Sequence, residues 1–330
     1  MPLAIPHRFA RLLRLIVAAL LTAFVLWKAS PSAVVRAGAQ ADLSWVAVAV
    51  ALVVADRSLM AYRWLVLLRP IDAAGRPPLG ALLRIFFVST FLGTFLPASV
   101  GGDAVRAYSL AKLRVPTGPA VASVLMDRLL GVLSIVVVGA LGLMLARSRV
   151  IVPSGAVDAS MFLATSACLV GALLVFSERV ARWATAVALR LPFTVVRRTA
   201  VELTGATRAY AGFHGELANV LGGSIGVQLL RIVQAYCLGR ALAIDASVVI
   251  YFAFIPLILL VMLLPVSING IGTSQVAFVW FFGRAGVPQA EAFALSVLFV
   301  ALGIVGNLPG GVLYAFAPDP KKFVNAAHSD

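Results

Sequence analysis

Charged side chains inside otherwise apolar stretches are the first candidates for chemistry in this sequence. Arg63, Arg128 and Arg231 each lie within such a stretch, and Asp127 directly precedes Arg128. A charge at the centre of a membrane helix costs about 2.5–3.5 kcal/mol on insertion scales, so an arginine without a role is unfavourable there. Because a guanidinium group binds phosphate through two parallel hydrogen bonds, these residues predict a site for an anionic, phosphate-bearing ligand. The alternative is structural: the arginines pair with Asp56 and Asp127 and only stabilise the helices.

A polar segment interrupts the apolar sequence at residues 95 to 106. It contains Pro97, Gly101, Gly102, Asp103 and Arg106. Backbone groups freed from helical hydrogen bonding cannot face lipid, so this segment should be buried in protein or line a watered cavity. A helix start favours anions, so we expect Arg106 to bind a phosphate beside free N–H groups, with Asp103 orienting it. These two residues are three apart on one helical turn, and the alternative is that they pair only with each other.

A second break resembles the first at a constant spacing. Residues 263 to 270 repeat residues 95 to 102, with proline, serine and glycine recurring 168 residues later. The arginines at 63 and 231 have the same spacing. Paired breaks in corresponding halves of a membrane protein point to a transport site, so the sequence predicts two halves that are copies of one another.

The second break differs from the first because it carries no charge. Its polar side chains are those of Asn269, Thr273, Ser274 and Gln275. We expect Asn269 and Gln275 to contact the ligand through neutral hydrogen bonds. The alternative is that these groups only satisfy the freed backbone.

Composition assigns the chain to the membrane. It is 62% hydrophobic and 12% charged, with a mean hydropathy of +1.02, whereas soluble domains are about 45–50% apolar. The net charge is +14, but the basic residues are spread through loops and spans, which argues against nucleic acid and favours anionic lipid as the partner. Cys168 and Cys237 lie in apolar stretches and predict neither a disulfide nor a metal site. No catalytic motif is present, so we expect neither enzyme activity nor a cofactor.

An all-α polytopic membrane fold is expected to position these residues. Six spans are predicted at about 12–27, 43–68, 119–145, 159–176, 217–242 and 289–316, with re-entrant hairpins at about 80–113 and 247–283. The chain then forms one membrane domain, residues 1–330. Its parts are a first helix and loop (1–42), a first repeat (43–145), the fourth helix with a basic cytoplasmic interfacial segment (146–216), a second repeat (217–316) and a cytoplasmic tail (317–330). The arginines after the fourth helix alternate with apolar residues, which suits helices lying on the membrane surface.

Basic residues predict the orientation of the chain. If the amino terminus is cytoplasmic, seventeen basic residues fall on the cytoplasmic side and six on the outer side, as the positive-inside rule requires. Both termini are then cytoplasmic in a multi-pass protein of the cell inner membrane. The first hairpin enters from the cytoplasm and the second from outside, so the repeats are related by inversion.

Several of these motifs resemble those of a known family, the lysylphosphatidylglycerol synthase transmembrane (flippase-like) family. The matching pieces are Arg63-Trp64, Leu96-Pro97 through Gly102-Asp103 to Arg106, Asp127-Arg128, and Gly270-Ile271-Gly272 followed by Gly286 and Ala290. In that family an acidic residue usually follows the second break, and Gln275 occupies that place here. The synthases add a soluble aminoacyl-transfer domain, whereas this chain ends at Asp330 and resembles only the lipid-translocating part.

The residues and the resemblance together favour a flippase-like transporter that moves an anionic phospholipid or a lipid-linked precursor between leaflets. The headgroup would enter the hairpin cavity, with Arg63 and Arg106 serving the cytoplasmic side and Arg231 the outer side. One alternative is a membrane-embedded lipid-modifying enzyme that uses Asp103 or Asp127. Another is a non-transporting scaffold that delivers lipid to a lipid-synthesis partner protein.

Overall fold

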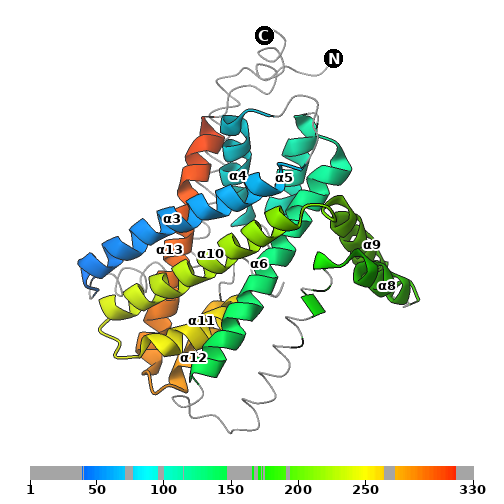
Figure 1. The fold of residues 1–330 in the computed structure, drawn as a ribbon. Helices are drawn as coiled ribbons and strands as arrows, with labels where there is room; N and C mark the ends of the chain where they lie inside the picture. The colour runs from blue at the N-terminus through cyan, green and yellow to red at the C-terminus, as the bar shows by residue number, and fades with distance from the viewer. Residues whose placement is uncertain are drawn as a thin grey trace.

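The computed structural model describes most of the chain between residues 39 and 316. The described residues are 39, 41–70, 77–95, 100–113, 115–146, 166, 170–171, 173, 175–190, 194–263 and 272–316. Within these ranges the chain is helical or forms turns between helices, and no strand occurs. This confirms the predicted all-helical class for the described part (Figure 1).

Four helices are long and apolar enough to cross a membrane. They are α3 (Leu43–Leu67), α6 (Thr117–Ala146), α10 (His214–Ala241) and α13 (Gln289–Ala315). They match four of the six predicted spans within a few residues. The span predicted at 12–27 lies outside the described residues, and so does most of the one predicted at 159–176.

Short helices occupy the places where the two hairpins were predicted. The first pair is α4 (Leu79–Gly93) with α5 (Val100–Lys112), and the second pair is α11 (Val248–Met262) with α12 (Thr273–Gly283). The order long, short, short, long therefore occurs twice along the chain. Figure 1 shows the first pair at one end of the helix bundle and the second pair at the other. The breaks themselves, at 96–99 and 264–271, lie outside the described residues.

The helices α3 and α10 run antiparallel and in close contact, which brings Arg63 next to Gly223 (Figure 1). A Cβ atom at Gly223 would lie 2.9 Å from Cγ of Arg63, so a glycine is needed for this approach. The carboxyl end of each helix is held by a residue that precedes the other helix. The Asp42 N–H donates to the Ala241 carbonyl at 2.9 Å, and the Tyr210 hydroxyl donates to the Leu67 carbonyl at 2.5 Å.

The two halves pack against one another through glycines. The first short helix of each half contacts the last long helix of the other half: α4 packs on α13, and α11 packs on α6. A Cβ atom at Gly310 would overlap the carbonyl oxygen of Phe87, and one at Gly142 would overlap that of Phe252. Phe252 O has no helical donor four residues later, because that residue is Pro256. Small residues thus allow backbone contact where the halves meet.

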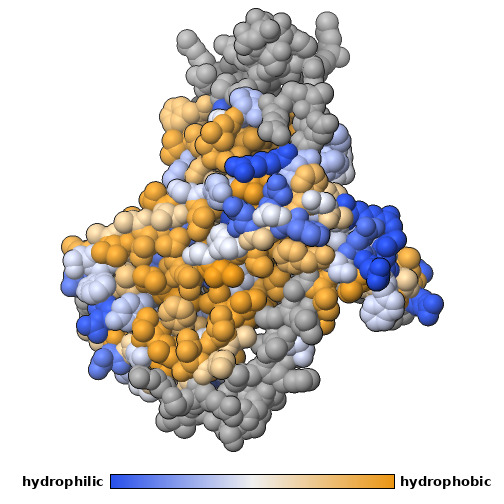
Figure 2. Space-filling model, in the orientation of Figure 1, coloured by the Kyte–Doolittle hydropathy of each residue, from blue (hydrophilic) through white to orange (hydrophobic). Residues whose placement is uncertain are grey.

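Two amphipathic helices, α8 (Glu178–Ala188) and α9 (Thr194–Ala209), form a pair that projects from the side of the bundle (Figure 1). They occupy the predicted basic interfacial segment. Figure 2 shows hydrophilic side chains gathered on this pair, whereas α3, α10 and α11 present a broad apolar surface. The pair of α8 and α9 also exposes apolar side chains, those of Trp183 and Val201. Its location at the membrane surface stays a prediction.

Candidate functional site

A polar cavity of about 330 Å³ lies between the two halves, lined mainly by α3, α4, α5, α6, α10 and α13. Its charged residues are Arg57, Arg63, Arg106, Arg128, Arg231, Asp56, Asp103 and Asp127. Five arginines and three aspartates leave a formal charge of +2 in an otherwise apolar bundle. An uncompensated charge in such surroundings is costly, so the cavity favours an anionic occupant.

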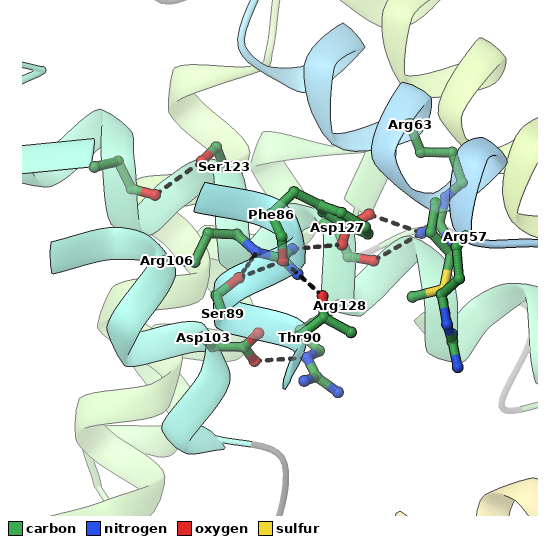
Figure 3. Close-up of polar contacts among 12 residues, drawn as sticks. Arg57, Arg63, Phe86, Ser89, Thr90, Asp103, Arg106, Ser123, Asp127 and Arg128 are labelled. Atoms are coloured by element: carbon green, nitrogen blue, oxygen red, sulfur yellow. Dashed lines mark hydrogen bonds and ion pairs between the residues drawn. The ribbon is translucent and has the colours of Figure 1, made fainter. Parts of the chain in front are cut away.

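The first cluster of charges forms around Asp127 on α6 (Figure 3). Its Oδ1 accepts from Nη2 of Arg63 at 2.8 Å, and its Oδ2 lies 3.3 Å from Nη1 of Arg106. The Arg106 guanidinium also lies over the rings of Trp64 and Phe86, at 5.1 and 4.9 Å from their centroids. Both arginine side chains are buried. These contacts hold the two guanidinium groups rigidly beside one shared carboxylate.

The second cluster forms around Asp56 on α3, whose side chain is only 2% exposed. Its Oδ2 accepts from Nη1 of Arg57 at 3.0 Å, and its Oδ1 lies 3.4 Å from Nε of Arg231 on α10. Arg231 Nη2 also lies 3.4 Å from the sulfur of Met60. As in the first cluster, one buried carboxylate is shared by two guanidinium groups.

The structural alternative for the arginines therefore describes real contacts: Arg63 pairs with Asp127, and Arg231 pairs with Asp56. Because each carboxylate is also shared with a second arginine, both clusters keep a net positive charge after pairing. Ion pairing and ligand binding are thus compatible at this site.

Asp103 neither orients Arg106, as predicted, nor forms the alternative ion pair with it. Asp103 Oδ2 instead accepts from Nε of Arg128 at 2.6 Å, while Arg106 turns towards Asp127 (Figure 3). The reason is helical geometry, because neighbouring residues on α6 point about 100° apart. Asp127 therefore faces α3 and the buried side of α5, whereas Arg128 meets Asp103 near the more exposed part of the cavity.

Several buried polar atoms of cavity residues have no hydrogen-bond partner within the described chain. The donors are Arg57 Nε, Arg63 Nε and Gln234 Nε2. The acceptors are Gln228 Oε1, Asn307 Oδ1 and Asp56 Oδ1, and the last of these lies at an ion-pair distance from Arg231. Leaving a buried polar group unsatisfied costs about 1–3 kcal/mol. A ligand with both phosphate oxygens and a donor group would satisfy both kinds of atom.

Outside the spans, Tyr210 is the titratable group most closely linked to this site. Burial, with a smaller effect from the Asp127 carboxylate, raises the pKa of its hydroxyl. The hydroxyl therefore stays protonated and keeps donating to the Leu67 carbonyl at the end of α3. This bond anchors the helix that carries Arg63.

The structure brings most of the predicted site residues together. Arg63, Gly102, Asp103, Arg106, Asp127, Arg128 and Arg231 all line the cavity. Gly102 lies where α5 crosses α4, and a Cβ there would be 2.7 Å from the Ser89 carbonyl oxygen. Gly101 is in the same first turn of α5. Pro97 and Asn269 lie outside the described residues.

Gln275 has a different place from the one predicted. Its Oε1 accepts from the Gly272 N–H at 2.6 Å and from the Ser274 hydroxyl at 3.0 Å, so it caps the start of α12. It does not line the cavity described above. This geometry matches the alternative in which polar groups at the second break satisfy freed backbone.

Sequence reasoning missed several polar cavity residues, among them Arg57 and Gln234. A signal was available for these two. Arg57 is a second charge beside Asp56 within an apolar stretch, and Gln234 lies three residues after Arg231 and so on the same helical face.

Comparison with known proteins supports the resemblance noted from the motifs. The sequence profile of the family described as Lysylphosphatidylglycerol synthase TM region matches residues 11–310. No curated protein matches the chain. The match covers most of the 330 residues, including the first repeat, the second repeat up to residue 310, and every cavity residue. The chain therefore belongs to the Lysylphosphatidylglycerol synthase TM region family.

Proposed function

We propose that this protein is a flippase-like transporter that moves an anionic phospholipid or a lipid-linked precursor between the leaflets of the cell inner membrane. The observation that carries the proposal is the excess of arginine over aspartate in a cavity between helices that are long and apolar enough to cross a membrane. Phosphate groups can neutralise that excess, and a lipid can leave its tails in the bilayer. Membership of a family named for a lipid synthase supports a lipid substrate.

The arrangement of the halves supports alternating access. Helix order repeats, the short pairs lie at opposite ends of the bundle, and the cavity lies where the halves meet (Figure 1). Inverted repeats of this kind place substrate at their interface, and rocking one half against the other exchanges access. In this proposal the short pairs are re-entrant hairpins, and Arg63 and Arg231 hold the phosphate at successive stages. The positive-inside count favours a cytoplasmic location for both termini.

The engagement of the aspartates supports transport over catalysis. Asp56, Asp103 and Asp127 each form ion pairs with arginine, so all three carboxylates are already engaged by guanidinium groups. We therefore propose that the protein is not an enzyme, and that it serves a lipid-synthesis partner by moving its product or precursor. Formation of a modified lipid by the purified protein would contradict this part of the proposal.

Reconstituted protein tests the transport proposal directly. In proteoliposomes, the full chain should move a fluorescent anionic phospholipid between leaflets. Arg63→Gln and Arg231→Gln should each slow that movement by at least about tenfold, because each removes one guanidinium from a buried pair. Arg284→Gln is the matched control, since Arg284 is exposed at the end of α12. Wild-type rates in both folded cavity variants would contradict the mechanism.

A further inference from the structure

The charges of the cavity divide into two separate and equal groups. Around Asp127, the guanidinium groups of Arg63 and Arg106 share one carboxylate. Around Asp56, those of Arg57 and Arg231 share another. Each group therefore has a formal charge of +1. The third pair, Asp103 with Arg128, is neutral and adds nothing to either.

The two groups lie at different levels of the same cavity. Asp56 and Arg63 are seven residues apart on α3, which corresponds to about 10 Å along the helix. Arg63 and Arg106 belong to the level nearer α5. At the other level, Arg57 donates to the Gly303 carbonyl of α13, and Arg231 belongs to α10. Because the ion pairs form within each level and not between them, each level presents its own group of guanidinium donors to an anion.

Each level also contains unsatisfied donors. Arg63 is 4% exposed. Its Nε has no partner within the described chain, and neither has the Nε of Arg57. Gln234, three residues after Arg231, is 4% exposed, and its Nε2 has no partner among the described residues. Both levels can therefore donate hydrogen bonds to an anion without breaking an existing ion pair.

We propose that each level is a subsite for one singly charged phosphodiester, and that Asp56 and Asp127 act as selectivity residues by limiting each subsite to a charge of +1. This inference rests on the proposed function, because it names the headgroup class that the transporter accepts. A phosphodiester neutralises a subsite. A phosphomonoester carries up to two negative charges at neutral pH, and the second would stay uncompensated in a buried site.

Two lipids that differ only by a methyl group provide the test. Phosphatidylmethanol is a phosphodiester, and phosphatidic acid with the same acyl chains is a phosphomonoester. Binding of each is measured by native mass spectrometry on the full chain in phosphatidylcholine nanodiscs at about pH 8, where the monoester is doubly charged. The wild type should prefer phosphatidylmethanol by at least about tenfold.

Removing either shared carboxylate raises the charge of its subsite to +2. Asp56→Asn and Asp127→Asn should therefore reverse the preference, so that phosphatidic acid binds more tightly than phosphatidylmethanol. Asp245→Asn, an exposed aspartate outside the cavity, is the charge-matched control and should keep the wild-type ratio. A wild-type ratio in the folded cavity variants would overturn the inference.

A measurement on the wild type covers the case in which a variant does not fold. At about pH 5 phosphatidic acid carries a single charge, so the wild-type preference should shrink to less than about twofold. The same ratio at both pH values would overturn the inference. Leaflet exchange, measured on the same protein, separates the two claims. Lipid movement with unchanged ratios refutes only the charge rule, whereas reversed ratios without movement refute only transport.

Discussion

The two short helix pairs have the same place in their halves but different contents. The pair α4 and α5 contributes Asp103 and Arg106 to the cavity. The pair α11 and α12 instead builds an aromatic core, in which Phe282 lies within 5.1 Å of the Tyr251 ring centroid and 5.7 Å of those of Phe254 and Phe278. Repetition of helix order therefore does not mean repetition of role.

The two halves therefore share their architecture but differ in what their short helix pairs contribute. Helix lengths and glycine contacts are shared by both halves, so the architecture is symmetric. Charge is concentrated in the first half, because the first short pair contributes Asp103 and Arg106 to the cavity, whereas the second pair supplies apolar packing. We expect substitutions in the second pair to affect stability and those in the first to affect lipid binding.

The largest expected effect is on the aromatic core. Phe282→Ala should lower the free energy of unfolding by about 3–5 kcal/mol, because Phe282 is fully buried and its removal leaves a cavity. Val276→Ala on the same helix should change it by less than about 0.5 kcal/mol, since Val276 is 70% exposed. Steric-trapping measurements in nanodiscs would compare the unfolding free energies of the two variants. If Phe282→Ala lowered the free energy of unfolding no more than Val276→Ala does, the aromatic core around α12 would not support the fold.

The glycine contacts between halves should respond alike. Gly310→Ala and Gly142→Ala each place a methyl group against backbone, so each should cost about 1–3 kcal/mol of unfolding free energy. Gly303→Ala, also on α13, is the control, because nothing lies within 4 Å of its added Cβ. The same unfolding measurement applies. A large loss at only one of the two sites would break the proposed symmetry of architecture.

A smaller effect is expected at Arg106, where binding and stability should separate. Arg106→Gln should weaken binding of phosphatidylglycerol by about tenfold, or about 1.4 kcal/mol, because it removes a cation from the Asp127 cluster. Arg106→Lys should restore it only in part, since an ammonium cannot form two parallel bonds to phosphate. Native mass spectrometry measures retained lipid, with Arg284→Gln as the control from the second pair. Equal retention in every variant would remove the distinction between the pairs.

The smallest effect concerns how the long helices are anchored. Tyr210→Phe removes the bond to Leu67 and should cost about 0.5–1.5 kcal/mol. The raised pKa of Tyr210 adds a pH dependence. Because the unfolded-state pKa is about 10, this contribution is present below pH 10 and is lost as the pH rises above it. The Asp42 N–H that anchors α10 has no such dependence.

Thermal unfolding between about pH 8 and pH 11 would check this. The wild type should lose stability above pH 10 by a larger amount than Tyr210→Phe does. Parallel curves for the two proteins would contradict the link between the hydroxyl and the stability of α3.

Much of this architecture was predictable from local sequence. The four described spans follow from apolar runs of about 20 residues or more, and the repeat follows from the common spacing of Arg63 and Arg231. Family membership followed from short motifs around the same charges and is confirmed by the match to residues 11–310. A buried charge is costly wherever it lies, so the sequence alone marks it for attention.

The pairing of those charges was decided only by tertiary structure. Asp103 was expected to serve Arg106, three residues away, but α6 offers Arg128 at 2.6 Å. Gln275 was expected at the ligand and instead caps its own helix. Sequence determines which residues carry charge and which face of a helix they occupy. The partner of each charge depends on which other helix packs against that face, and residues separated by more than 60 positions, such as Arg63 and Asp127, meet only once the helices have assembled.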